Sequence, residues 1–147
     1  MSAFQLPIAV ERKIKTLIYL AQRPEGVGVS VKEIAEILGV TWYPAMEVMV
    51  SLSNNLLVVN DFVEGYRLTK KPEEIRVSEL LREIEGLFIF GESTYQYQLE
   101  NMSEPIEYSI GEMWVNLRKS VYNALSQVTI ADLMKRVKEI SGEEGFF

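Results

Sequence analysis

The chain has 147 residues, of which 48% are hydrophobic, so it can form one domain, or one domain with a dimerising extension. It contains neither cysteine nor histidine, which excludes disulfides, thiolate zinc sites, cysteine-ligated iron–sulfur clusters and catalysis by a cysteine nucleophile or a histidine base. The net charge of −6 gives no long-range attraction to nucleic acid, although an acidic protein can still carry a local basic face.

No apolar run approaches the roughly 20 residues of a membrane-spanning helix, and the N-terminal residues show no secretory signal pattern. We therefore expect a cytoplasmic protein with no membrane partner. No nucleophile, base or cofactor motif can be assembled from the sequence, so we expect no enzymatic activity, no metal and no cofactor.

Two helices are predicted at the start of the chain. Apolar residues spaced three and four apart predict the first helix from Pro7 to about Gln22. The second helix starts after Ser30, a favourable N-cap with Glu33 three positions later as a capping box, and ends at Gly39. Its expected buried face consists of Ile34, Ala35, Ile37 and Leu38.

A third helix and a hairpin follow. Thr41 is the expected N-cap of this helix and Pro44 lies in its first turn, where the missing N–H has no cost. The apolar residues expected to face the core are Met46, Val50 and Leu52. Residues 57–59 and 66–68 are expected to pair as a hairpin with residues 60–65 at its tip. Helix, glycine turn, helix and hairpin together predict a winged helix-turn-helix.

The rest of the chain is predicted to be helical, with an irregular insert. Ser78 is the expected cap of a fourth helix over about 79–85, and residues 86–111 form a variable loop region. A long helix is expected at about 112–127, and Thr129 caps a last helix over 130–140. The predicted organisation is therefore a winged-helix domain at 1–85, the variable region at 86–111, and a dimerisation helix with a C-terminal helix at 112–147.

Three stretches of the sequence together resemble segments of one known family. The first is Val29–Glu36, like the start of the family's second helix. The second and strongest is Gly65–Ile75, read Gly-Tyr-Arg-Leu-Thr-Lys-Lys-Pro-Glu-Glu-Ile and continuing to Glu85-Gly86, like the family's wing-to-helix signature. The third is Met113-Trp114 with Val128–Leu133 downstream, similar to the family's dimerisation helix and C-terminal segment. On these stretches the chain resembles the Rrf-type family of winged-helix transcription regulators, which includes the iron–sulfur sensor IscR, the nitric-oxide sensor NsrR and the cysteine-metabolism repressor CymR.

The resemblance implies a fold that is mainly α with a small β-hairpin wing, in a homodimer that binds duplex DNA. Each winged helix would address one half-site, and the long helices would cross at the dimer interface, whose expected residues are Trp114, Leu117, Val121 and Leu125. Cluster-binding members carry three cysteines in the region matching 86–111, and this chain has none there. A cluster-free member is therefore expected.

The surface expected to contact DNA, formed by the third helix and the wing, lacks positive charge. No lysine or arginine occurs in the 34 residues from Glu33 to Tyr66, which contain five carboxylates. DNA-binding surfaces normally neutralise phosphates with bases. The expected DNA-binding residues are the exposed third-helix set Thr41, Trp42, Tyr43, Glu47, Ser51 and Asn54, with Arg67, Lys70 and Lys71 after the wing. Bases on the first helix, Arg12, Lys13 and Lys15, are a further candidate surface.

Three alternatives remain open from the sequence. The fold could have lost DNA binding and act as a dimeric protein–protein interaction module, with a regulatory protein on the third-helix face. A small ligand could bind an aromatic cluster formed by Phe88, Phe90, Tyr95, Tyr97 and Tyr108. A hard cation could bind the carboxylates of Glu92, Glu100, Glu104 and Glu107, although their spacing matches no calcium loop.

Overall fold

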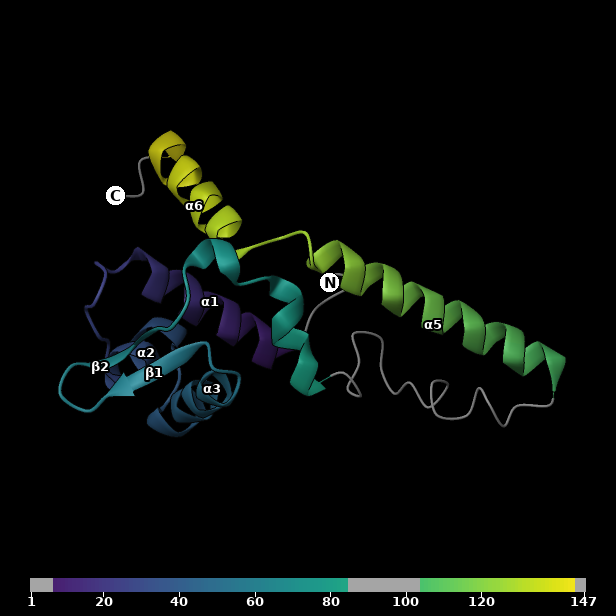
Figure 1. The fold of residues 1–147 in the computed structure, drawn as a ribbon, viewed down its shortest axis with the longest axis horizontal. Coiled ribbons are helices and arrows are strands. Elements are labelled where there is room, and N and C mark those ends of the chain that lie inside the picture. Colours follow the sequence, from purple (N-terminus) through teal and green to yellow (C-terminus); the bar gives the residue numbers. More distant parts are fainter. Residues whose placement is uncertain (1–6, 85–103, 145–147) are drawn as a thin grey trace.

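A computed structural model describes residues 7–84 and 104–144. The first helix, α1 (Ile8–Gln22), packs against the helix-turn-helix formed by α2 (Val31–Leu38) and α3 (Trp42–Asn54). The antiparallel hairpin of β1 (Val58–Asp61) and β2 (Gly65–Leu68) follows, so the predicted helix-turn-helix and wing are both present (Figure 1). Val58 pairs with Leu68 and Asp61 pairs with Gly65, which leaves a three-residue tip at 62–64.

Two 3₁₀-helices, η1 (Pro72–Glu74) and η2 (Val77–Ile84), connect the wing to the C-terminal part of the chain. The fourth helix is thus a 3₁₀-helix that begins earlier than predicted. Ser78 is buried inside η2 and is not its cap. At the start of this helix the backbone N–H of Arg76 instead donates to the side-chain carboxylate of Glu79 at 3.3 Å.

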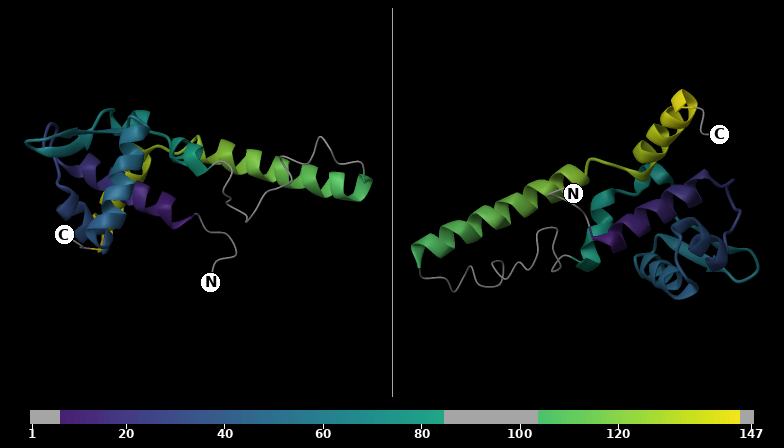
Figure 2. Two further views of the ribbon diagram at one scale, coloured as in Figure 1. Left: turned by 90° about the horizontal axis from the view of Figure 1, so that it is seen from below. Right: turned by 180° about the vertical axis from the view of Figure 1, so that it is seen from behind.

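The long helix α5 (Pro105–Leu125) begins seven residues before its predicted start at 112. Pro105 occupies its first turn, and the carboxylate of Glu104 accepts the backbone N–H of Glu107 at 2.8 Å, which caps the helix. The polar, tyrosine-containing sequence before Gly111 hid this start. Figures 1 and 2 show α5 extending away from the winged helix, with only its C-terminal end close to the other elements.

The last helix, α6 (Ile130–Glu144), folds back onto α1. Its predicted cap is confirmed: Thr129 Oγ1 accepts the N–H of Asp132 at 3.1 Å, and Asp132 accepts the N–H of Thr129 at 3.0 Å. Short backbone pairing ties this junction to the segment after the wing, since Val77 N donates to Val128 O and Ile130 N donates to Ile75 O, each at 2.9 Å. The exit point of α5 is therefore fixed to the winged-helix domain.

The core lies where α1, α2, α3 and the hairpin meet, and its fully buried side chains include Leu17, Ile34, Met49, Leu52 and Ile130. Two predictions of core residues were wrong. In α2, Ile34 and Ala35 are buried but Ile37 is exposed. In α3, Val48 and Met49 are buried, whereas Val50 is exposed and Met46 is only half-buried.

The start of α2 is tied to α1 as well as capped. Ser30 Oγ accepts the N–H of Glu33 at 3.2 Å, as the capping box predicts. The carboxylate of Glu33 accepts the hydroxyl of Tyr19 at 2.7 Å, and this hydrogen bond raises the pKa of Tyr19. Gly39 ends the helix with a φ of 66°, a left-handed conformation that glycine adopts without strain. These contacts fix the helix-turn-helix against the rest of the domain.

Candidate nucleic-acid interface

The third helix carries two opposite stripes. Residues Ala45, Val48, Met49 and Leu52 follow the helical repeat and pack inward. On the other side a second stripe lines a shallow depression and consists of Tyr43, Met46, Glu47, Val50, Ser51 and Asn54. Of the predicted DNA-binding residues of this helix, Thr41, Trp42, Tyr43, Glu47 and Asn54 are exposed and Ser51 is half-buried. The structure therefore brings Tyr43, Glu47, Ser51 and Asn54 together on one outward face, with Thr41 and Trp42 exposed at the start of the helix.

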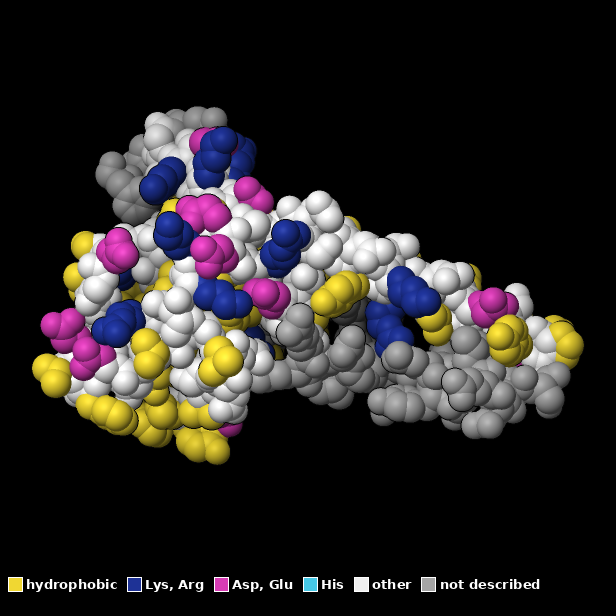
Figure 3. Space-filling model, viewed as in Figure 1, with side chains coloured by type: hydrophobic (Ala, Val, Ile, Leu, Met, Phe, Trp, Pro, Cys, Tyr) yellow, Lys and Arg dark blue, Asp and Glu magenta, His cyan; other side chains and the backbone are white. Residues whose placement is uncertain are grey.

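This face is apolar and aromatic as well as polar. The side chains of Trp42 and Tyr43 are 58% and 68% exposed, and Val50 is exposed beside them. Figure 3 shows hydrophobic side chains gathered along the lower edge of the domain, where α3 lies, with lysine and arginine higher on the surface. Thr41 stands at the N-cap position of α3 but makes no side-chain cap hydrogen bond, so its hydroxyl is not committed to capping.

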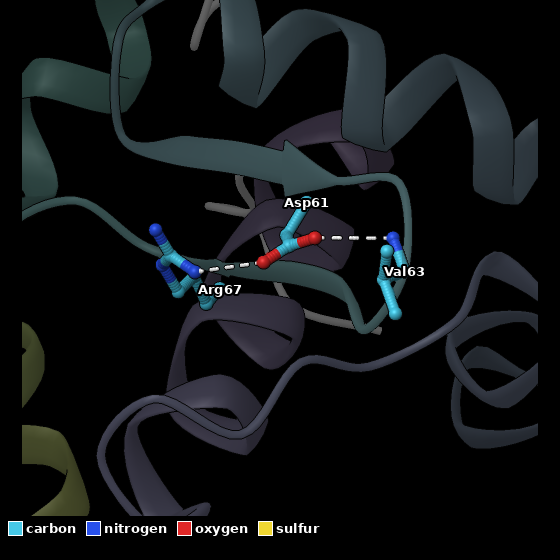
Figure 4. Close-up of polar contacts among 3 residues, drawn as sticks. All are labelled: Asp61, Val63 and Arg67. Carbon is cyan, nitrogen blue, oxygen red and sulfur yellow. Dashed lines mark hydrogen bonds and ion pairs between the residues drawn. The ribbon is translucent and has the colours of Figure 1, made fainter.

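The wing is held by a carboxylate at the end of β1. One oxygen of Asp61 accepts the backbone N–H of Val63 at 3.0 Å, and the other lies 3.4 Å from the guanidinium of Arg67 (Figure 4). The hydrogen bond from Val63, a further one from the backbone of Glu64 and the charge of Arg67 together lower the pKa of Asp61. Arg67, one of the predicted phosphate contacts, is therefore already paired within the wing.

The other bases after the wing also have acidic neighbours. Lys70 Nζ lies 4.0 Å from a carboxylate oxygen of Glu79. Arg67, Lys70 and Lys71 share a hollow with the loop after α1, and the acids Glu25, Glu73 and Glu74 line the same hollow. Exposed ion pairs are worth at most about 1 kcal/mol, so phosphates can displace these carboxylates. These lysine and arginine side chains can still contact phosphates, but the surface is not uniformly positive.

The candidate surface on the first helix is smaller than predicted. Lys13 is only 4% exposed and lies among the buried residues of α1, so it cannot serve as a surface phosphate contact. Lys15 is exposed and Arg12 is half-buried. The prediction that all three bases form one solvent-facing surface was wrong, because Lys13 falls on the inward side of the helix.

The sequence predicted the tip of the wing at residues 60–65 but did not single out the apolar residues that it exposes. Phe62 and Val63 are 93% and 92% exposed, and they are the most exposed large hydrophobic side chains among the described residues. A signal was present in the sequence: an aspartate two positions before Val63 and a glycine at 65 are typical of a tight, side-chain-supported turn. Such a turn presents the residues between them to solvent.

The predicted dimer-interface residues lie along α5. Leu117 is exposed, while Trp114 and Val121 are half-buried. Leu125, at the C-terminal end, packs against the domain's own core together with Tyr122. Further exposed apolar residues continue along the helix toward its N-terminus, at Ile106, Ile110 and Met113.

Most of the aromatic and carboxylate alternatives fall in a part of the chain that the structure does not describe. Phe88, Phe90, Tyr95, Tyr97, Glu92 and Glu100 lie outside the described residues. Glu104 and Tyr108 belong to the start of α5, where Glu104 acts as the helix cap. Within residues 7–84 and 104–144, no group of three or more potential metal-ligating side chains comes together, and no helix is long and apolar enough to cross a membrane.

A family model described as an iron-dependent transcriptional regulator, Rrf2, matches residues 8–136, most of the chain. The chain belongs to the Rrf2 family. It is thus a member of a family of transcriptional regulators rather than of enzymes.

Solved structures with the same fold include members of this group. IscR from T. potens matches with a TM-score of 0.68 and 24% identity, covering 93% of this chain and 90% of that one. CymR (YrzC), the global cysteine regulator of B. subtilis, matches with a TM-score of 0.66 and 21% identity, covering 89% and 96%. Staphylococcus aureus CymR matches with a TM-score of 0.64 and 22% identity, covering 87% of this chain and 96% of that one. The winged-helix fold predicted from the sequence is confirmed.

The family description implies iron, and the side chains of this Rrf2 protein do not fit a cysteine- or histidine-ligated iron centre. Thiolates and imidazoles are the usual ligands of iron–sulfur clusters, and the sequence contains neither residue type. The described residues also gather no carboxylate set that could replace them.

Proposed function

We propose that this protein is a cytoplasmic, homodimeric transcriptional regulator that binds duplex DNA through α3 and the wing and carries no iron–sulfur cluster. The observation that carries this proposal is the outward stripe of α3, which stands beside a structured wing. A helix with one face in the core and a polar, aromatic face exposed can enter a major groove.

The side chains on the outward stripe of α3 support DNA recognition without arginine. The hydroxyl of Thr41 and the amide of Asn54 can bond to phosphates or to base edges, and the carboxylate of Glu47 can accept a hydrogen bond from the amino group of cytosine. Arg67, Lys70 and Lys71 would contact phosphates beside the groove. Most of the positive charge would thus act at the border of the interface.

The proposed dimer rests on α5. This helix of 21 residues projects from the domain and exposes Ile106, Ile110, Met113 and Leu117 at spacings of four, three and four residues. An apolar stripe on a projecting helix needs a partner surface, and a two-fold axis would place an identical stripe against it. The two winged helices would then address two half-sites.

Selection from a random duplex library tests DNA binding. The purified full-length protein is incubated with 30-bp random duplexes at low salt, and bound DNA is amplified and sequenced over several rounds. The proposal predicts an enriched motif with two-fold symmetry, and Asn54→Ala should lower affinity for it. Absence of any enriched sequence would contradict the proposal.

A second candidate is supported by the same face. Trp42 and Tyr43 are large, exposed and free of basic neighbours in sequence, which suits a protein partner as well as DNA. A regulator of this kind would bind a protein through α3 and leave DNA unbound. It predicts a partner whose affinity falls in the Trp42→Ala/Tyr43→Ala double variant, while the random-duplex selection enriches nothing.

A further inference from the structure

The tip of the wing exposes apolar surface that the domain does not use. The side chains of Phe62 and Val63 are almost fully exposed, and Phe62 belongs to a residue type that is usually buried. In Figures 1 and 2 the loop between β1 and β2 reaches the outer edge of the domain. Single exposed apolar residues are common, so exposure alone does not assign a role.

The tip is held in place, and this distinguishes it from an ordinary loose loop. Asp61 bonds the N–H of Val63 and pairs with Arg67, so the chain is braced on both sides of Phe62. At the base of the tip, Val29 and Tyr66 exchange two backbone hydrogen bonds of 2.8 Å. Gly65 has a φ of 100° and leaves no room for a side chain against Val29. Phe62 is therefore presented on a braced turn.

The wing stands beside α3, since β1 packs directly on that helix. A loop beside a helix that lies in the major groove meets the neighbouring phosphate backbone and the minor groove beyond it. Proteins that enter the minor groove often insert an apolar side chain between base steps, which partly unstacks them. Phenylalanine is one of the residues used in this way.

We propose that Phe62 is a minor-groove wedge that inserts between two base pairs of the bound duplex. This inference rests on the proposed DNA binding and adds how affinity arises on a protein surface without lysine or arginine. A stacked ring contributes affinity without neutralising a phosphate, which suits a segment with no lysine or arginine from Glu33 to Tyr66. Val63 is smaller and lacks a flat face, so it assists without stacking.

The test uses the enriched 30-bp duplex with 2-aminopurine at its most easily unstacked pyrimidine–purine step near the edge of the motif. Wild-type protein should raise the 2-aminopurine fluorescence, and Phe62→Ala should abolish this rise. Phe62→Ala should also weaken binding by about tenfold, within the range found for loss of one stacked aromatic side chain. Phe62→Leu should give an intermediate loss.

Two controls separate a wedge from a general defect. Ile8→Ala removes an exposed apolar side chain far from the wing in sequence and should leave binding unchanged. Phe62→Ala should keep the wild-type slope of log Kd against log salt, because no phosphate contact is lost, whereas Lys71→Ala removes one phosphate contact from each protomer and should reduce the slope by about 2.

The outcomes distinguish this inference from the function on which it rests. If wild-type protein binds the duplex and Phe62→Ala binds equally well without changing the fluorescence, the wedge is wrong and the regulator proposal stands. If wild-type protein enriches no duplex, both are wrong. If Phe62→Ala weakens binding of a protein partner instead, the tip is a protein contact and the wedge is wrong.

Discussion

Arg67 and Asp61 are paired across the wing, with 3.4 Å between a guanidinium nitrogen and a carboxylate oxygen. The same carboxylate holds the turn through the N–H of Val63. One residue thus both shapes the wing and neutralises the base nearest to it. This relationship explains how a wing can keep its arginine and still present little positive charge.

Replacement of Asp61 by asparagine should strengthen DNA binding. The asparagine side-chain oxygen can still accept the N–H of Val63, so the turn is kept, while Arg67 is released to contact a phosphate. We expect affinity for the selected duplex to rise severalfold and the salt slope to steepen by about 2, since one Arg67 is released in each protomer. Fluorescence anisotropy over a salt series measures both. Asp61→Ala is the matched control: it also frees Arg67 but loses the turn, so a gain in Asp61→Ala equal to that in Asp61→Asn would contradict this role for the turn.

The carboxylate of Asp61 also makes the stability of the protein depend on pH. Hydrogen bonds from Val63 and Glu64 and the charge of Arg67 hold the pKa of Asp61 below its usual value of 3.8. A depressed folded-state pKa contributes stability that is present above pH 3.8 and is lost as the pH falls through the folded value. Thermal unfolding of the wild type should therefore lose more stability than that of Asp61→Asn between pH 5 and pH 3. If the stability of the two proteins falls equally with decreasing pH, the contacts of the Asp61 carboxylate are absent in solution.

Leu56 lies between α3 and β1 with a φ of 61°, and its side chain is 74% exposed. A left-handed conformation costs a residue with a Cβ about 1–2 kcal/mol, and glycine avoids that strain at some cost in unfolded-chain entropy. Leu56→Gly should raise the free energy of unfolding by about 0.5–1 kcal/mol, measured by urea denaturation. Leu56→Ala keeps the strain and should give no such gain. A loss of stability in Leu56→Gly would show that the leucine side chain makes a stabilising contact.

The dimer proposed for α5 can be tested at Leu117. Leu117→Glu places a charge on the exposed apolar stripe, where a two-fold contact would bring two copies of it close together. Sedimentation at micromolar concentration should show a dimer for the wild type and a monomer for Leu117→Glu. Asn116→Glu, an exposed polar position on the same helix, should remain dimeric. A monomeric wild type would refute the dimer.

Much of the fold was predictable because its boundaries are marked by local chemistry. Ser30 with Glu33, Gly39, and Thr129 are caps whose hydrogen bonds or backbone angle depend on a few neighbouring residues. The hairpin was predictable for the same reason, since Gly65 and Tyr66 stand at the start of a short alternating strand. These signals need no knowledge of the tertiary structure.

The register of α3 could not be predicted in this way. The helix has apolar residues on both sides, with Val48 and Met49 buried, Val50 exposed and Met46 half-buried, so periodicity alone does not select the buried face. Packing against α2 and β1 decides it. The burial of Lys13 and the pairing of Arg67 with Asp61 also depend on contacts between elements, which is why the sequence overestimated the available positive charge.

The salt dependence of binding to the selected duplex shows whether α3 and the wing bind DNA with few neutralised phosphates. Arg67, Lys70 and Lys71 from two protomers could neutralise at most six phosphates, so the slope of log affinity against log salt should be about −5 or shallower. We expect measurable binding to a two-fold symmetric site with such a slope. A much steeper slope would show a basic surface that this structure lacks, and no binding to any duplex at low salt would contradict the assignment of α3 and the wing to DNA.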